Sequence, residues 1–168
     1  LGIMGATGCG KTSLISLIPR FYDVTEGQIL VDGIDVRDYK RSALMDRIGF
    51  VFQKSELFGA TIRENIGWGC ENPSMDQIET AAKIAQAEEF ILKMPQQYES
   101  MVAQKGMSLS GGQKQRISIA RAMMKPCEIL ILDDATSALD LKTEADFYRG
   151  LSAHNPELTK VIVAQRVS

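Results

Sequence analysis

The stretch Ile129-Leu130-Ile131-Leu132-Asp133-Asp134 decides the fold that we expect of this chain. Its four consecutive apolar residues lack the polar alternation of a half-exposed strand, so they predict a strand buried on both faces in a parallel sheet. The strand then ends in two carboxylates, Asp133 and Asp134. Ligands bind at such strand ends in open α/β sheets, so we expect a ligand site there.

A phosphate-binding pattern follows the first apolar run of the chain, residues 1–4. It reads Gly5-Ala6-Thr7-Gly8-Cys9-Gly10-Lys11-Thr12 and matches G-x-x-x-x-G-K-[ST]. We expect a strand before this loop and a helix over 10–18 after it. In such a loop the backbone approaches the phosphates closely, Lys11 reaches the outer phosphates and Thr12 places its hydroxyl on magnesium. The alternative is a glycine-rich turn that only happens to precede a lysine.

A loop that holds phosphates needs a carboxylate beside it to hold the magnesium ion. Asp133 is the natural candidate, because it ends the buried strand. We therefore predict that strand 1–4 and strand 129–132 end next to each other over one nucleotide site.

Composition limits the partners and the compartment. The chain has 168 residues, enough for one domain with a core, and its formal net charge of -2 gives no electrostatic footprint for nucleic acid. Three scattered cysteines indicate a reducing compartment, and no run of 18 apolar residues offers a membrane anchor. The chain begins inside a predicted strand and ends directly after another, so we expect an excerpt truncated at both ends.

Further elements follow from local patterns. Residues 28–36 predict a hairpin on the Asp32-Gly33 turn, and a capping box from Ser74 to Gln77 opens a helical insertion. The remaining predictions are a helix at 39–46, a strand at 48–52 before Gln53, one helix from 75 to 92, a helix at 140–151, a surface loop at 152–157 with His154, and a strand at 161–164 before Gln165.

A second anion-binding pattern lies at Leu109-Ser110-Gly111-Gly112-Gln113, which runs into a predicted helix at 114–124. One nucleotide does not need two phosphate-type loops. Either both loops converge on one ligand within a monomer, or the second serves a nucleotide held by another subunit. A flexible turn is the remaining alternative.

Taken together, these motifs resemble the nucleotide-binding domain of an ABC transporter over nearly the whole chain. The phosphate loop, Gln53, the sequence 109–113, the strand ending at Asp133, and Ser137-Ala138-Leu139-Asp140 stand in that family's order. The resemblance implies an α/β P-loop NTPase core with a mostly parallel sheet, a small antiparallel piece and a helical insertion. It divides the chain into a catalytic core, 1–72 and 126–168, and a helical subdomain, about 73–125.

The resemblance also implies the ligands, ATP and Mg²⁺, and a head-to-tail pair of domains with two nucleotides between them. It assigns the ATP phosphates to Gly5, Ala6, Thr7, Gly8, Cys9, Gly10, Lys11, Thr12, Ser13 and Gln53. It assigns magnesium to Thr12, Gln53 and Asp133. The partner domain's ATP falls to the signature residues Ser110, Gly111, Gly112 and Gln113. Residues 53–70 would meet coupling helices of a transmembrane domain at the cytoplasmic face of the cell membrane, and no nucleic acid is involved.

Two positions depart from the family, which usually has glutamate where Asp134 stands and histidine where Gln165 stands. Both catalytic positions concern hydrolysis, so we expect slow turnover at this chain's own site and a heterodimer whose partner carries glutamate and histidine. The segments 57–66 and 134–140 resemble exporters. Gln165 beside Asp134, together with residues 64–69 and 81–86, resembles the degenerate half of bacterial heterodimeric multidrug exporters. The alternatives are tolerated variants in an active site, a regulatory ATP-dependent clamp, and a soluble ABC ATPase.

Overall fold

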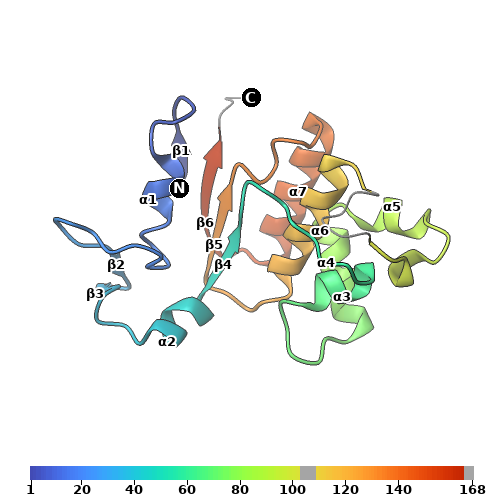
Figure 1. Cartoon of the computed structure of the whole chain (residues 1–168), viewed down its shortest axis with the longest axis horizontal. Coiled ribbons are helices and arrows are strands. Elements are labelled where there is room, and N and C mark those ends of the chain that lie inside the picture. The colour runs from blue at the N-terminus through green and yellow to red at the C-terminus, as the bar shows by residue number, and fades with distance from the viewer. Residues whose placement is uncertain (103–108, 165–168) are drawn as a thin grey trace.

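A computed structural model describes residues 1–102 and 109–164 of the chain. Its main sheet has four parallel strands, in the order β1 (Gly2–Met4), β6 (Thr159–Ala164), β5 (Ile129–Asp133) and β4 (Ile48–Val51). Figure 1 shows α1 (Lys11–Ile15) on one side of this sheet, whereas α3 to α7 lie on the other. The predicted α/β class with a mostly parallel sheet is confirmed.

The strand β5 lies inside the sheet, between β6 and β4. Leu130, Ile131 and Leu132 are at most 1% exposed. Ile131 packs into the core on the α1 side, whereas Leu130 and Leu132 pack into the core on the side of the helices. Because side chains alternate across a strand, an unbroken apolar run can cover both faces, as predicted.

The prediction that the first strand and β5 end next to each other is wrong. Strand β6 lies between them, with Met4 opposite Ala164 and Val163 opposite Asp133. The order of parallel strands depends on how the connecting helices pack, and a single strand's sequence does not carry that information. The phosphate loop nevertheless reaches Asp133, because α1 follows it and carries Thr12 to that carboxylate.

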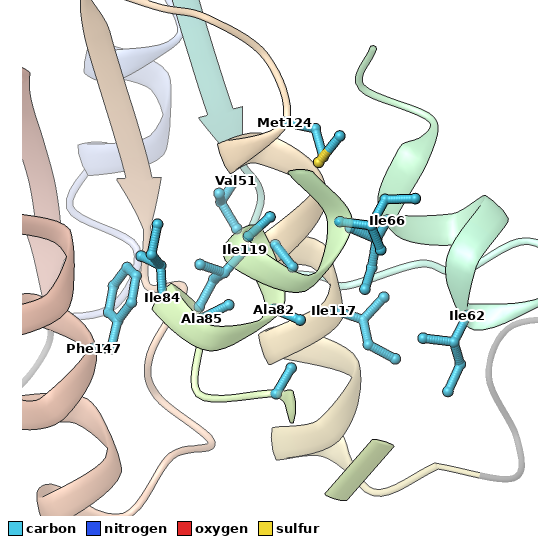
Figure 2. Packing of buried hydrophobic residues seen from close by; sticks show 14 of the residues in the cluster. Val51, Ile62, Ile66, Ala82, Ile84, Ala85, Ile117, Ile119, Met124 and Phe147 are labelled. Carbon is cyan, nitrogen blue, oxygen red and sulfur yellow. The ribbon is translucent and has the colours of Figure 1, made fainter. Parts of the chain in front are cut away.

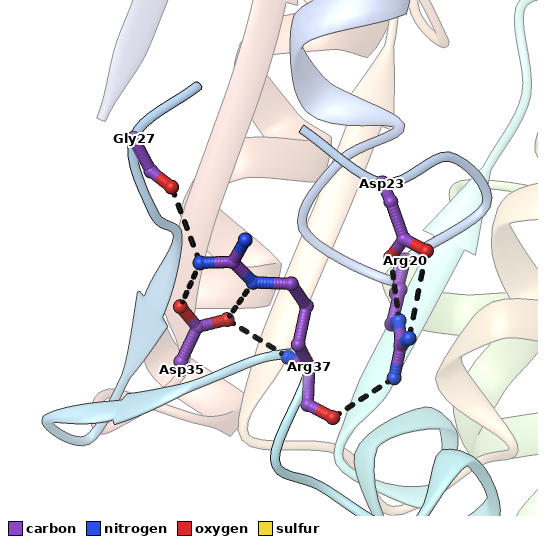
Figure 3. Close-up of polar contacts among 5 residues, drawn as sticks. All are labelled: Arg20, Asp23, Gly27, Asp35 and Arg37. Atoms are coloured by element: carbon purple, nitrogen blue, oxygen red, sulfur yellow. Dashed lines mark hydrogen bonds and ion pairs between the residues drawn. The ribbon is translucent and has the colours of Figure 1, made fainter. Parts of the chain in front are cut away.

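The predicted hairpin forms a second, two-stranded antiparallel sheet from β2 (Leu30–Val31) and β3 (Ile34–Asp35). Its turn residues have φ values of 50° at Asp32 and 78° at Gly33, as a tight Asp-Gly turn requires. Figure 3 shows how ion pairs fasten this region.

In that cluster Arg37 donates to the Asp35 carboxylate at 2.7 Å and to the Gly27 carbonyl at 3.2 Å. Arg20 pairs with Asp23 at 2.7 Å and donates to the Arg37 carbonyl at 3.0 Å. These contacts tie the hairpin to the segment that follows α1.

The helix α1 is shorter than the predicted 10–18. After Ile15 the hydrogen bonds tighten, since Leu17 N–H donates to the Leu14 carbonyl and Ile18 N–H to the Ile15 carbonyl. Within α1 itself, Ile15 is buried whereas Leu14 is 52% exposed. The helix predicted at 39–46 is confirmed as α2 (Arg41–Asp46).

The helices between residues 62 and 92 differ from the prediction in two places. The helix expected over 75–92 is broken into α4 (Met75–Ile84) and α5 (Glu88–Leu92), because Gln86 has a left-handed φ of 57°. An unpredicted helix, α3 (Ile62–Gly67), begins with its own capping box from Thr61 to Glu64. The short 3₁₀ turn Gln97–Glu99 follows α5.

The longest helices are α6 (Gly111–Met123) and α7 (Leu141–His154). Figure 2 shows Ile117 and Ile119 of α6 packed among Ile62, Ile66 and Phe147, which come from α3 and α7. His154 is exposed as predicted, but it ends α7 instead of lying in a loop. Within residues 1–102 and 109–164, no helix has the length and apolar character needed to span a bilayer.

Candidate functional site

The phosphate-type loop joins β1 to α1 and depends on its glycines. Gly8 and Gly10 have φ values of 82° and 90°, a left-handed conformation that other residues rarely adopt. A Cβ atom on Gly5 would lie 2.8 Å from Cys9 Sγ, closer than real Cβ contacts. The sequence pattern therefore reflects both conformational and steric requirements of the loop.

The Lys11 side chain folds back over this loop. Its Nζ donates to the Gly5 carbonyl at 2.7 Å and to the Ala6 carbonyl at 2.9 Å. The two carbonyls hold a positive charge at the mouth of the loop, where a phosphate would meet it.

The Thr12 hydroxyl and the Asp133 carboxylate are in contact at the carboxyl end of the parallel strands. Thr12 Oγ1 donates to Asp133 Oδ2 at 2.9 Å, with Oδ1 at 3.2 Å. Asp133 is 3% exposed, and burial raises the pKa of its carboxyl, although the hydrogen bond from Thr12 and the charge of Lys11 oppose the rise. A buried carboxylate of this kind gains from a bound cation.

Thr12 and Asp133 fit a magnesium ion that also binds water and phosphate better than a metal ion bound by protein side chains alone. In the described part of the chain no cluster of three or more His, Cys, Asp or Glu side chains has the arrangement of a metal site. Mg²⁺ is usually bound through one or two carboxylates together with water and substrate phosphates. The Thr12 hydroxyl and the Asp133 carboxylate beside a phosphate loop meet that requirement.

The second carboxylate, Asp134, has a different environment. Its φ is 50°, a left-handed value that Asp tolerates at the end of a strand, and its N–H donates to the Val163 carbonyl at 3.0 Å. Gln53 Nε2 donates to Asp134 Oδ2 at 3.2 Å, so the second residue after β4 reaches the residue after β5. The other predicted catalytic residue, Gln165, lies outside the described residues.

A cavity of about 240 Å³ brings most of the predicted ATP and magnesium residues together. It is lined by Thr7, Gly8, Gly10, Lys11, Thr12, Ser13, Gln53, Asp133, Asp134 and Val163. Small-molecule sites usually measure roughly 300–1,000 Å³, so this cavity is smaller than is typical of them. Residues 110–113 are not among its lining residues.

The signature residues form the start of α6. Ser110 Oγ accepts from the Gln113 N–H at 3.2 Å, and Gln113 Oε1 accepts from the Ser110 N–H at 2.9 Å, which makes a capping box. Ser110 and Gly111 are exposed. A Cβ on Gly112 would lie 2.8 Å from the Ala138 carbonyl oxygen, so glycine is required where this helix contacts the segment after β5.

Sequence reasoning missed Gln115, which is 5% exposed and hydrogen-bonded to residues 137 and 138. A signal was present, because a polar residue four positions before the buried Ile119 stands on the apolar face of α6. Nothing in the sequence indicated what that amide would contact.

Comparison with known proteins found a matching family model and several relatives. A family model described as "ABC transporter" matches residues 1–137. The chain is 48% identical over its whole length to the "Putative multidrug export ATP-binding/permease protein YgaD" and 49% identical to the "Uncharacterized ABC transporter ATP-binding protein YfiB", both of Bacillus subtilis (strain 168).

A solved structure shares the fold. It is the "Structure of a bacterial Atm1-family ABC exporter with ATP bound", which matches 98% of this chain with a TM-score of 0.94 and 41% identity. The chain spans 29% of the length of that exporter and of both Bacillus relatives.

Proposed function

The chain belongs to the ABC transporter family, and on that premise we propose that it is the ATP-binding domain of an exporter. In this proposal the domain binds ATP and Mg²⁺ and uses ATP-driven pairing and hydrolysis to power export. The observation that carries the proposal is the contact of Thr12 Oγ1 with the buried Asp133 carboxylate at 2.9 Å, beside the phosphate loop. Support for an exporter comes from the similarity to YgaD, named as a multidrug export protein, and to the Atm1-family exporter.

The chain's own residues would divide the work of holding the nucleotide. The loop 5–13 provides backbone N–H groups to the phosphates, and Lys11 neutralises their outer charge. Thr12, Gln53 and Asp133 hold the magnesium ion, which when bound neutralises charge between the phosphates. Asp134 is the group placed to orient the attacking water, and its bond to Gln53 fixes its carboxylate.

We propose that this site binds ATP tightly but cleaves it slowly. Aspartate is one methylene shorter than the family's glutamate, which withdraws the carboxylate by roughly 1 Å, and such a misplacement can cost on the order of 10²-fold in rate. A glutamine side chain can donate a hydrogen bond but, unlike histidine, can carry no charge and shuttle no proton, so Gln165 is expected to slow hydrolysis as well. A regulatory clamp whose ATP is never cleaved is the second candidate, and the same residue, Asp134, favours it.

The signature residues in this proposal serve a second nucleotide-binding domain. The start of α6 is exposed and lies outside the lining of the cavity beside the phosphate loop. We propose that 73–125 is the helical subdomain that carries the signature, that 1–72 and 126–168 form the catalytic core, and that two domains pair head to tail. Because the signature is complete while Asp134 and Gln165 depart from the family, a heterodimer with a hydrolytically competent partner is the preferred pair.

A groove between the sheet and α6 is the proposed docking site for the transmembrane domain. It has a volume of about 650 Å³ and is lined by apolar residues of β4 and by Phe58 and Arg121. Phe58 lies 4.6 Å from the exposed Trp68, measured between ring centroids, and the Arg121 guanidinium lies 4.8 Å from the Phe58 ring. Within 53–70 this aromatic surface fits a coupling helix at the cytoplasmic face of the membrane.

The ATP site is tested with Lys11→Ala in the intact protein. Loss of the ammonium over the loop should weaken Mg-ATP binding at least about tenfold, because hydrogen bonds to charged groups contribute about 1.5–3 kcal/mol. Equilibrium binding of a fluorescent ATP analogue measures the effect. The control is Lys93→Ala, since Lys93 is exposed and pairs with Glu89 of α5, away from the phosphate loop. Equal binding by Lys11→Ala and Lys93→Ala would contradict the proposed site.

A further inference from the structure

A chain of hydrogen bonds joins the signature helix to the backbone of Asp134. Gln115 Oε1 accepts from the Ala138 N–H at 2.9 Å, and Gln115 Nε2 donates to Ser137 Oγ at 3.2 Å. The Ser137 hydroxyl in turn donates to the Asp134 carbonyl at 2.9 Å. The oxygen and the nitrogen of the Gln115 amide therefore both form hydrogen bonds to the segment that follows Asp133 and Asp134.

A second contact lies one turn earlier on the same helix. The backbone at Gly112 approaches the Ala138 carbonyl so closely that a Cβ there would lie 2.8 Å from the oxygen. Gly112 sets how near the two segments come, and Gln115 sets their register through two hydrogen bonds. The start of α6 and residues 134–138 consequently behave as one unit.

We propose that Gln115 is a positioning residue that fixes the segment 134–138 against the signature, and thereby controls ATP turnover without contacting the nucleotide. The inference rests on the proposed function. Gln115 is 5% exposed, and a buried amide left without partners is costly, so the segment is strongly held in this one arrangement. Asp134 is held from its other side by Val163, which accepts its N–H.

The contact between the start of α6 and residues 134–138 affects ATP turnover because it joins parts of two different ATP sites. Asp134 belongs to the chain's own site, whereas the signature at the start of α6 serves the partner's ATP in the proposed pair. A shift of the segment displaces the acid relative to the signature, which affects turnover at both sites. The phosphate loop joins β1 to α1, and Lys11 lies at the start of α1. Because these residues keep their geometry when the segment 134–138 shifts, the affinity for ATP stays unchanged.

The test uses the intact transporter with its partner subunit and compares Gln115→Met, Ser137→Ala and the double variant. We expect each single variant to lower kcat about tenfold or more, since small misplacements carry penalties of that order, while KM for ATP changes less than about twofold. The double variant should lose no more than the larger single effect, because both side chains act through one chain of contacts. Additive losses, or a raised KM with unchanged kcat, would overturn the inference.

A structural readout without nucleotide complements the kinetics. Hydrogen exchange of residues 135–139 should become faster in Gln115→Met, because the Ala138 N–H loses its acceptor. The control is Ile119→Val, a core substitution on the same helix that should lower the melting temperature but keeps both hydrogen bonds of Gln115. Ser137 is exposed, so Ser137→Ala leaves no cavity and keeps the fold. Equal exchange in Gln115→Met and Ile119→Val at matched melting temperatures would overturn the inference.

ATP binding to this subunit purified without its partner separates the inference from the proposed function. If Lys11→Ala weakens that binding about tenfold or more while Gln115→Met and Ser137→Ala keep the parent kcat in the paired transporter, the positioning role alone is wrong. If Lys11→Ala binds ATP as tightly as the parent in the subunit without its partner, the proposed ATP site itself is wrong.

Discussion

Asp133 is 3% exposed and accepts the Thr12 hydroxyl at 2.9 Å, and burial raises the pKa of its carboxyl. Burial disfavours the ionised form, while a bound magnesium ion requires it. In the proposed site this side chain therefore serves metal binding at the expense of stability in the nucleotide-free protein.

The first prediction concerns Asp133→Asn. A carboxyl whose folded pKa is raised contributes stability that is present at low pH and is lost as the pH rises from 3.8 through the raised pKa. The side chain in Asp133→Asn does not ionise, so the variant does not lose stability as the pH rises. Its melting temperature without nucleotide should therefore exceed that of the parent by a margin that grows over this pH window. Parallel melting curves across the window would contradict the prediction.

The same substitution should weaken Mg²⁺-dependent ATP binding at least about tenfold, the loss that removing even an outer partner of a metal ligand produces. Magnesium titration of ATP binding at fixed pH measures it, with Asp46→Asn as a control whose carboxylate ends α2, away from the cavity.

Many individual residues of the candidate site could be predicted from the sequence. The phosphate loop is one continuous segment, and its chemistry follows from backbone geometry. Asp133 was predictable as well, since a buried apolar run ends there. The hydrogen bonds of Gln115 were not predictable, because their partners lie 22 and 23 positions further along the chain. The predicted role of Gln165 stays a prediction, since that residue lies beyond the described ones.

Three helices begin at capping boxes, at Thr61 for α3, Ser74 for α4 and Ser110 for α6. The pattern at Ser74 correctly located a helix, and the same pattern at Thr61 was overlooked. The break at Gln86 and the early end of α1 depend on tertiary packing and tight turns, which apolar spacing alone does not reveal. The order β1-β6-β5 likewise follows from how the chain crosses over the sheet.

The matched caps of α4 and α6 give a prediction that separates stability from function. Ser110→Ala and Ser74→Ala each remove a side-chain acceptor from the N–H three residues later, so each should lower the free energy of unfolding by about 0.5–2 kcal/mol. Only Ser110→Ala should also reduce the ATPase rate of the paired transporter, because only that helix start is proposed to meet the partner's ATP.

Denaturant unfolding and steady-state ATPase assays on the same samples measure both effects. An ATPase loss of equal size in Ser74→Ala would show that the fall reflects stability and would remove the signature role.

The parallel sheet places three kinds of group at one edge: the phosphate loop after β1, Gln53 after β4, and the two carboxylates at the end of β5. The signature stands on α6, among the helices on the other side of the sheet from α1 (Figure 1). In the proposed pair one domain carries two half-sites, and the pairing follows from their separation. We propose that the half-site with Asp134 holds ATP and cleaves it slowly.

That claim is tested most directly by measuring phosphate release in single-turnover experiments on the intact protein purified without a partner, with Asp134→Glu as the comparison. The parent should bind Mg-ATP but release phosphate slowly, whereas the restored methylene in Asp134→Glu should accelerate release by up to about 10²-fold. Rapid release by the parent, with no gain in Asp134→Glu, would contradict the account.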